Sequence, residues 1–243
     1  LGQGTPKEKF RANIMAIQLL KKCEDENRNA TPEEQEILSR YVGWGGLADA
    51  FDETKAAWET EYLELKTVIT PEEYAAARAS TLNAHYTQPI VIESMYQVLE
   101  NLGFTKGNIL EPSMGVGNFF GMLPENLNQS KRLWRGIGQH QVAEIAKLLY
   151  PNANIQIKGF EKTDYPNDFF DVAIGNVPFG QYKVADKQYD KNNFLIHDYS
   201  LQRHWIKCVP VVWLLLSQAR EPWIRQVRGQ KDTLHKEQTC LVR

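Results

Sequence analysis

The stretch Asn108–Phe120, NILEPSMGVGNFF, decides the fold. A short apolar run leads into a turn that contains Gly115 and Gly117, and an aromatic pair then begins a helix. Glycine lets the backbone turn tightly and approach a ligand closely, and the first turn of a helix offers free N–H groups. The stretch therefore predicts a strand, a glycine turn and a helix. Taken alone, the turn also fits a purely structural role.

Alternating helices and strands follow the same pattern on either side. The expected helices span Pro89–Leu102 and Gln141–Tyr150, and the expected strands span Asn154–Phe160 and Phe170–Gly175. Such alternation predicts an α/β fold, in which a parallel sheet carries helices on both faces. Ligands of such sheets bind beyond the carboxyl ends of the strands, and the glycine turn lies at that edge.

The first 80 residues have a helical pattern instead. Thr31–Glu34 and Thr70–Glu73 each have Thr, Pro and Glu at the spacing of a capping box with proline in the first turn, so each predicts a helix start. Between them lies a glycine-rich turn, Gly43–Asp52, that carries Trp44. The turn could cradle a phosphate but lacks the Lys-Ser/Thr of a P-loop. We expect Trp44 to pack the helical region against the next domain.

The composition is that of an ordinary globular protein. The chain has 243 residues, 42% hydrophobic and 24% charged, and its 28 basic and 30 acidic residues give a net charge of −2, so total charge does not indicate nucleic-acid binding. Three cysteines without a CxxC pair argue against a disulfide scaffold or a zinc site. The longest apolar run, VPVVWLLL at 209–216, is far shorter than the ~20 residues of a membrane span. With no signal-peptide pattern, we expect a cytoplasmic protein.

A second polar turn closes the last expected strand. In Asp171–Gly180, DVAIGNVPFG, an apolar strand ends in Asn176 and a Val-Pro-Phe-Gly turn follows. An amide, a proline and an aromatic ring therefore reach one point at the carboxyl edge of the predicted sheet.

Taken together, these turns carry a family resemblance. Their order and spacing resemble those of gamma-type N6-adenine DNA methyltransferases, which use S-adenosylmethionine. With the glycine-rich turn added, the chain resembles the methylase segment at the front of very large helicase-methylase proteins of mobile elements and phages. The resemblance covers roughly residues 43–199. The motifs that carry it are YVGWGGLADAF (41–51), HYTQP (85–89), ILEPSMGVGNF (109–119), KTDY (162–165) and IGNVPFG (174–180).

The resemblance implies a Rossmann-like methyltransferase core over residues 81–199, with S-adenosylmethionine as cofactor and DNA as partner. It also implies a downstream helicase domain in the intact protein and requires no metal. The family's (Asn/Asp)-Pro-Pro-(Tyr/Phe) turn matches Asn176, Val177, Pro178 and Phe179. In that turn the Asn side chain and the next backbone carbonyl accept hydrogen bonds from the adenine amine, and the aromatic ring stacks on the flipped base. Val177 stands where the family has proline, which makes the turn less rigid.

The resemblance assigns further residues to the cofactor. Tyr86 and Thr87 would lie at its methionine end. Glu111, Pro112 and the Gly115/Gly117 turn would contact the methionine amine through a carboxylate and backbone groups. Asp164 would bind the amine of the cofactor's own adenine. Phe119 and Phe160 are expected in the core rather than stacked on the cofactor.

One expected residue is missing. Such folds usually end the second strand with an acid that binds the ribose hydroxyls, yet Lys131–Pro151 has no carboxylate before Glu144. Synonymous codons for 133–141, read one nucleotide later, spell YGVELDSI, and codons from Ser200 onward, read one nucleotide earlier, spell a helix, RPGG and VVAFV. We therefore interpret both segments as reading-frame errors; divergence and a genuine, unusual C-terminus are the alternatives.

This interpretation has structural and functional consequences. The sheet should be incomplete at its C-terminal side with its fourth strand exposed, and residues 200–243 should form a poorly ordered tail. Two other functions stay open: a glutamine N5 methyltransferase acting on protein, and an inactive fragment of a helicase-methylase protein.

Overall fold

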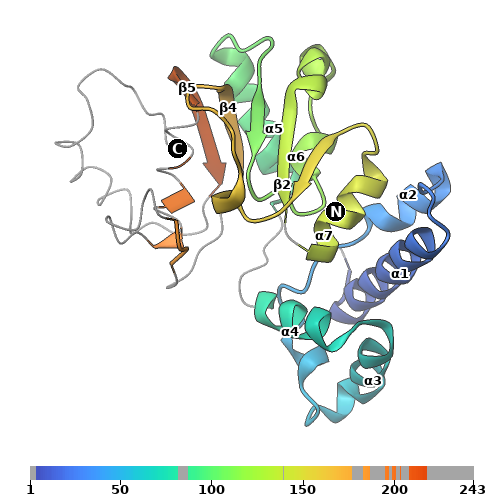
Figure 1. The fold of residues 1–243 in the computed structure, drawn as a ribbon. Coiled ribbons are helices and arrows are strands. Elements are labelled where there is room, and N and C mark those ends of the chain that lie inside the picture. Colours follow the sequence, from blue (N-terminus) through green and yellow to red (C-terminus); the bar gives the residue numbers. More distant parts are fainter. Residues whose placement is uncertain are drawn as a thin grey trace.

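A computed structural model describes residues 4–81, 87–138, 140–176, 183–186, 195–196, 199–200, 203 and 208–217. The N-terminal part is helical, as expected, and its α-helices and short 3-10 turns lie together beside the sheet (Figure 1). In chain order they are α1 (Pro6–Asp25), α2 (Pro32–Ser39), η1 (Ala48–Phe51), η2 (Ala56–Trp58), α3 (Glu59–Val68) and α4 (Pro71–Ser80).

Three of these helices begin with the same device. Thr31 and Thr70 cap α2 and α4 as predicted, and Thr5, which the sequence analysis passed over, caps α1. In each case the threonine side chain accepts a hydrogen bond from the third helical N–H, the glutamate at that position binds back to the cap, and proline fills the first turn. Local sequence therefore fixes where these helices start.

The glycine-rich turn closes the core of the helical region. Asn13 of α1 is fully buried; its Nδ2 donates to the Gly43 carbonyl at 2.6 Å, and its Oδ1 accepts from the Val42 N–H at 2.9 Å. The Trp44 ring packs edge-on against Phe51, with centroids 5.3 Å apart, and lies tilted against Phe10 at 6.0 Å. Both aromatic partners belong to the helical region. The buried cluster that contains Trp44 also includes Val116 and Ile145 of the next domain, which is consistent with the expectation that Trp44 packs the helical region against that domain.

The second part is a Rossmann-like α/β unit. Its strands pair in the order β3-β2-β1-β4-β5, all in parallel, which matches the first five strands of the 3-2-1-4-5-6 order (Figure 1). The strands are β1 (Ile109–Glu111), β2 (Trp134–Gly138), β3 (Asn154–Ile157), β4 (Phe170–Asn176) and β5 (Cys208–Ser217). Helix α5 (Pro89–Asn101) precedes β1, and the helical elements between the strands are α6 (Asn118–Gly121), η3 (Glu125–Leu133), α7 (His140–Leu149) and η4 (Phe160–Lys162).

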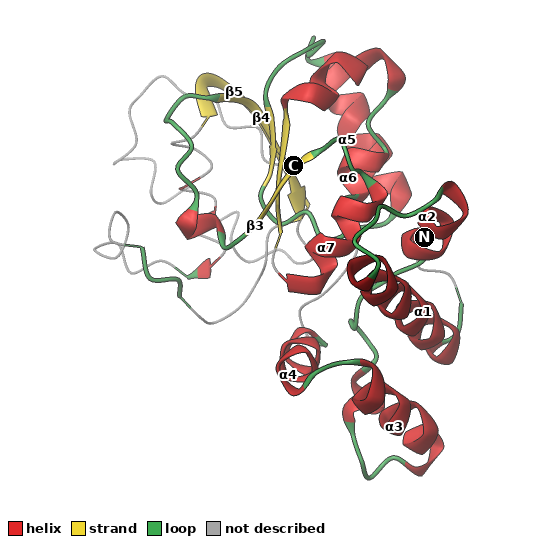
Figure 2. Ribbon diagram, turned by 45° about the vertical axis from the view of Figure 1, so that its right-hand side comes forward, coloured by secondary structure: helices red, strands yellow, loops and turns green. Residues whose placement is uncertain are grey.

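The helices cover one face of this sheet. Figure 2 shows α5, α6 and α7 on the same side of the strands, with α1 and α2 packed beyond α7. Apolar side chains of α5, including Ile92 and Leu99, share a core with Ile109 of β1 and Val172 of β4. The prediction of helices on both faces thus holds for one face among the described residues.

The prediction that the fourth strand forms an exposed edge of the sheet is wrong. β4 is not exposed, because β5 pairs with it in parallel from Phe170 to Asn176. The run VPVVWLLL of β5 is continuously apolar, a pattern typical of strands in parallel sheets. Ser200 and Arg203 are also buried, so the predicted poor packing from residue 200 onward is wrong for these described residues. Residues 218–243 lie outside the described residues, and the reading-frame interpretation stays a prediction.

Removing the Asn13 side chain should destabilise the helical region. In Asn13→Ala the Gly43 carbonyl and the Val42 N–H lose their partners inside the protein, which costs ~1–3 kcal/mol for each buried group. Urea denaturation should show a lower free energy of unfolding. Gln18→Ala changes an exposed residue of the same helix and is the matched control. Equal stability of the two variants would contradict this role of Asn13.

Candidate functional site

The strand order creates a switch point between β1 and β4. From β1 the chain adds β2 and β3 on one side and then returns to place β4 on the other side. In open α/β sheets ligands bind outside the carboxyl ends of the strands at such a point. Glu111 is the last residue of β1 and Asn176 is the last residue of β4. The two turns that sequence analysis singled out therefore leave neighbouring strands at the switch point.

The two strand ends are in close contact. A Cβ atom at Gly175 would lie 3.7 Å from Cγ of Glu111 and 3.8 Å from Cδ of Pro112. Glu111 is 1% exposed, Pro112 is buried, and Asn176 is half-buried. The structure thus brings the Glu111–Pro112 corner against the backbone that leads into Asn176.

The Glu111 carboxylate lies within electrostatic range of the buried phenol of Tyr96 and the partly buried phenol of Tyr150. Burial, and then the negative charge of Glu111, raise the pKa of Tyr96 well above its usual value and raise the pKa of Tyr150 to about 12. Both phenols therefore stay protonated near neutral pH. The Tyr96 hydroxyl donates to the Phe119 carbonyl and so joins α5 to α6. A buried acid fits a cationic amine as ligand, because a buried charge is stabilised by an opposite charge.

The glycine turn needs its glycines for conformation and for space. Gly115 and Gly117 have φ angles of 53° and 83°, in the left-handed region that side chains disfavour. A Cβ atom at Gly117 would lie 2.7 Å from Cε2 of Tyr150, and one at Gly121 would collide with the Tyr150 hydroxyl. The Tyr150 ring also packs against Phe120, with centroids 4.9 Å apart. The ring of Tyr150, which follows α7, therefore fills a notch along the turn and α6.

The end of β2 lacks the expected acid. Residues 134–138 contain no carboxylate, and Glu144 lies in α7, where its carboxylate is 3.9 Å from the Lys147 amine. Gly136 pairs with Glu111 in the sheet register, and a Cβ atom there would collide with the sulfur of Met114. Met114 thus lies over β2 where a side chain of that strand would otherwise stand.

The remaining predicted residues differ in burial, and some of them lie outside the described residues. Thr87 is half-buried, and its hydroxyl oxygen has no hydrogen-bond partner among the described residues. Asp164 is exposed and follows the buried Thr163 after η4. Phe119 and Phe160 are buried in the core, as expected. The other predicted residues, Tyr86, Val177, Pro178 and Phe179, lie outside the described residues.

A buried arginine that sequence analysis missed holds the segment before Asp164. Arg203 forms an ion pair with Asp186, and its Nη2 donates to the Thr163 carbonyl at 2.8 Å. Its guanidinium lies 5.1 Å from the centre of the Phe160 ring. The Tyr199 hydroxyl donates to the same Asp186 carboxylate at 2.8 Å. This network joins the chain after β3 to the chain that follows Asn176, and no local sequence pattern indicates it.

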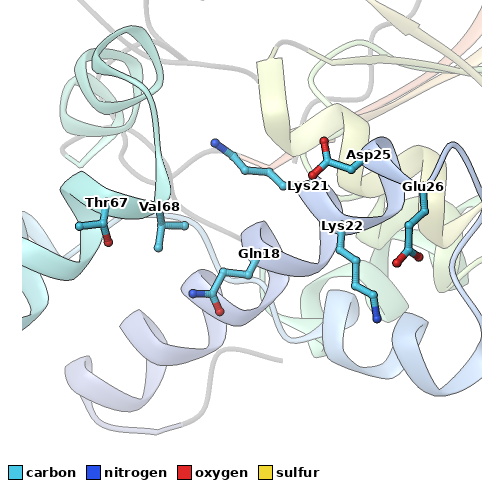
Figure 3. A pocket seen from close by; sticks show the side chains of 7 residues that line it. All are labelled: Gln18, Lys21, Lys22, Asp25, Glu26, Thr67 and Val68. Carbon is cyan, nitrogen blue, oxygen red and sulfur yellow. The ribbon is translucent and has the colours of Figure 1, made fainter.

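A hollow of about 490 Å³ lies elsewhere, on the helical region (Figure 3). Its lining carries both charge signs, and Lys21 forms an ion pair with Glu73 at 2.9 Å. The lining residues come from α1 and the end of α3, so none belongs to the sheet or its turns: Gln18, Lys21, Lys22, Asp25, Glu26, Thr67 and Val68. Its mixed charge indicates no ligand class.

Among the residues that the structure describes, no helix is both long and apolar enough to cross a membrane. The same part of the chain holds no group of three or more His, Cys, Asp or Glu residues that could bind a metal ion.

Comparison with known proteins gives distant similarities. No family model matches the chain. Over 175 residues it is 28% identical to the "Defense against restriction protein B" of Escherichia phage P1, a match that covers 70% of this chain and 6% of that protein.

Solved structures are also similar at a distance. The type I restriction-modification methyltransferase subunit of Streptococcus thermophilus is 14% identical, with a TM-score of 0.45, covering 89% of this chain and 58% of that one. Geranyl diphosphate C-methyltransferase of Streptomyces coelicolor, solved with S-adenosyl-L-homocysteine, is 12% identical, with a TM-score of 0.35 and coverages of 84% and 74%. Because these similarities are low, the strand order and connections of the chain itself identify its fold as Rossmann-like.

Proposed function

We propose that this chain is the methyltransferase part of a protein that transfers a methyl group from S-adenosylmethionine to N6 of adenine in DNA. One observation carries the proposal: the buried acid at the end of β1 and the amide at the end of β4 are neighbours at the switch point of the sheet. Adjacent strands lie about 4.8 Å apart, so groups bound at these two ends would meet.

Glu111 and the glycine turn would bind the cofactor. The carboxylate of Glu111 suits the positive methionine amine, and the close turn at Gly115–Gly117 lets backbone groups approach the ligand. The hydroxyl of Thr87, which has no hydrogen-bond partner among the described residues, is a further donor at the methionine end, as the family pattern implies. When bound, S-adenosylmethionine supplies an electrophilic methyl group on a sulfonium.

Asn176 would orient the target amine. The lone pair of the adenine amine is delocalised into its ring, which makes the amine a poor nucleophile. An Asn oxygen and the Val177 carbonyl that each accept one N–H would localise that lone pair toward the methyl group. Phe179 would stack on the flipped base. After transfer the surplus proton leaves to water, so no general base is needed.

The target class rests on the front of the chain and on its relative. The motif YVGWGGLADAF resembles the DNA-acting group, and the name of the phage relative fits an activity on DNA. Since the chain spans 6% of that relative, we propose that target recognition and any helicase lie in further parts of the intact protein.

Glu111→Gln should weaken cofactor binding. Loss of the charge removes the partner of the methionine amine, so the dissociation constant of S-adenosylmethionine should rise roughly 10- to 100-fold, or ~1.4–2.8 kcal/mol. Isothermal titration calorimetry measures this change. Glu144→Gln removes an exposed acid of α7 and should leave the affinity unchanged. As an independent check, the substitution should lower the pKa of Tyr150, because the Glu111 charge raises it. Unchanged affinity would contradict the role of Glu111.

Asn176→Ala should separate chemistry from cofactor binding. The turnover of adenine methylation should fall ~100-fold or more, because the amine loses its acceptor, while the S-adenosylmethionine affinity stays within ~3-fold. Tritiated methyl transfer is measured with adenine-containing DNA and, in parallel, with a glutamine-containing peptide. Transfer to the peptide but not to DNA would contradict the adenine proposal and favour the N5 alternative.

Restoring the second-strand acid should strengthen cofactor binding. Together with Met114→Ala, which frees the space that a side chain at position 136 needs, replacement of residues 133–140 by YGVELDSI places acids at positions 136 and 138. We expect the affinity of this chain for S-adenosylmethionine to rise at least ~10-fold through the ribose hydroxyls. The matched control, YGVQLNSI, has amides in place of both acids. Equal binding by both replacement chains and the original would contradict the reading-frame interpretation at this strand. Failure of the original and restored chains alike to bind S-adenosylmethionine would contradict the proposed function.

A further inference from the structure

The glycine turn after β1 is held from two sides. Val116, between the two glycines, is 2% exposed and belongs to the core of the helical region, together with Ile17 and Leu38. On its other side, Gly117 lies against the ring of Tyr150. The conformation of the turn therefore depends on residues outside the strand that carries it.

The second contact also leads back to the helical region. Nε2 of Gln35, in α2, donates to the carbonyls of Leu148 and Leu149 at 2.9 and 3.3 Å. These are the last residues of α7, whose C-terminal carbonyls have no partner within the helix. Tyr150 follows directly, and its N–H donates to the Ala146 carbonyl at 2.9 Å. Gln35 thus fixes the end of the helix from which the Tyr150 ring reaches the turn.

From these contacts we propose that helices α1 and α2 position the glycine turn, with Val116 and the Gln35–α7–Tyr150 connection as the two supports. The part of the proposal that concerns affinity rests on the proposed function, in which this turn binds S-adenosylmethionine. The helical region is then a structural component of the cofactor site. Val116, Gln35 and Tyr150 are positioning residues, because they act through the turn.

The first experiment measures the stability of the turn in the absence of cofactor. The Gly117 N–H donates to the Met114 carbonyl and the Gly121 N–H donates to the Gly117 carbonyl, each at 2.8 Å, so hydrogen exchange at these two amides reports whether the turn stays closed. In Val116→Ala and Gln35→Ala, both amides should exchange at least ~10-fold faster relative to the amides of β4.

Two control variants separate positioning from general stability. Leu65→Ala removes a fully buried side chain of α3 from the same core, so it should lower the melting temperature without a selective effect on the two turn amides. Tyr150→Leu should open the turn, whereas Tyr150→Phe keeps the ring in the notch and should restore normal exchange. Similar exchange profiles for Leu65→Ala and Val116→Ala would overturn the proposal.

Calorimetry with S-adenosylmethionine then tests separately whether the conformation of the turn affects cofactor binding. Variants that open the turn should bind the cofactor at least ~10-fold more weakly, and Tyr150→Phe and Leu65→Ala should bind it like the original chain. Faster turn exchange with unchanged affinity would overturn the effect on cofactor binding. If the original and restored chains both fail to bind S-adenosylmethionine while the exchange pattern is as expected, the proposed function fails and the support of the turn by α1 and α2 stands.

Discussion

The parallel pairing of β1 with β4 is the constraint on which the site depends. It is fixed at its start by polar contacts: the Asn108 N–H donates to the Asp171 carboxylate at 2.7 Å, and the Asn108 side chain donates to the Phe169 carbonyl at 3.1 Å. Ile109 then pairs with Val172. A one-residue slip would move every side chain of β4 to the opposite face, so this start sets which residue meets Glu111 at the other end.

Helices and turns could be predicted from the sequence where they depend on interactions between residues close together in the chain. Capping boxes at Thr31 and Thr70, and the glycine turn at Gly115 and Gly117, rest on hydrogen bonds and φ angles within a few residues. The contacts of Asn13, Val116 and Tyr150 could not be predicted in this way. Their partners are distant in the chain, and a single Asn, Val or Tyr in a sequence does not indicate which distant residue it contacts.

The prediction of a poorly packed segment from residue 200 onward fails at the described residues for a different reason. Residues 200–243 are interpreted as a reading-frame error, and their run VPVVWLLL has no alternation of polar and apolar residues. Strands of parallel sheets need no such alternation, and β5 pairs in parallel with β4. Arg203 lies in the same segment, where it forms an ion pair with Asp186 and donates to the Thr163 carbonyl.

The contact between Met114 and Gly136 links two positions that are far apart in the sequence. Because the Met114 sulfur occupies the space that a Cβ atom at position 136 would need, any larger residue there requires the methionine side chain to move. The two positions are therefore expected to change together during divergence. A lineage that gains an acid at position 136 benefits from first acquiring a smaller or differently shaped residue at position 114, so the order of the two substitutions matters as well as their identity.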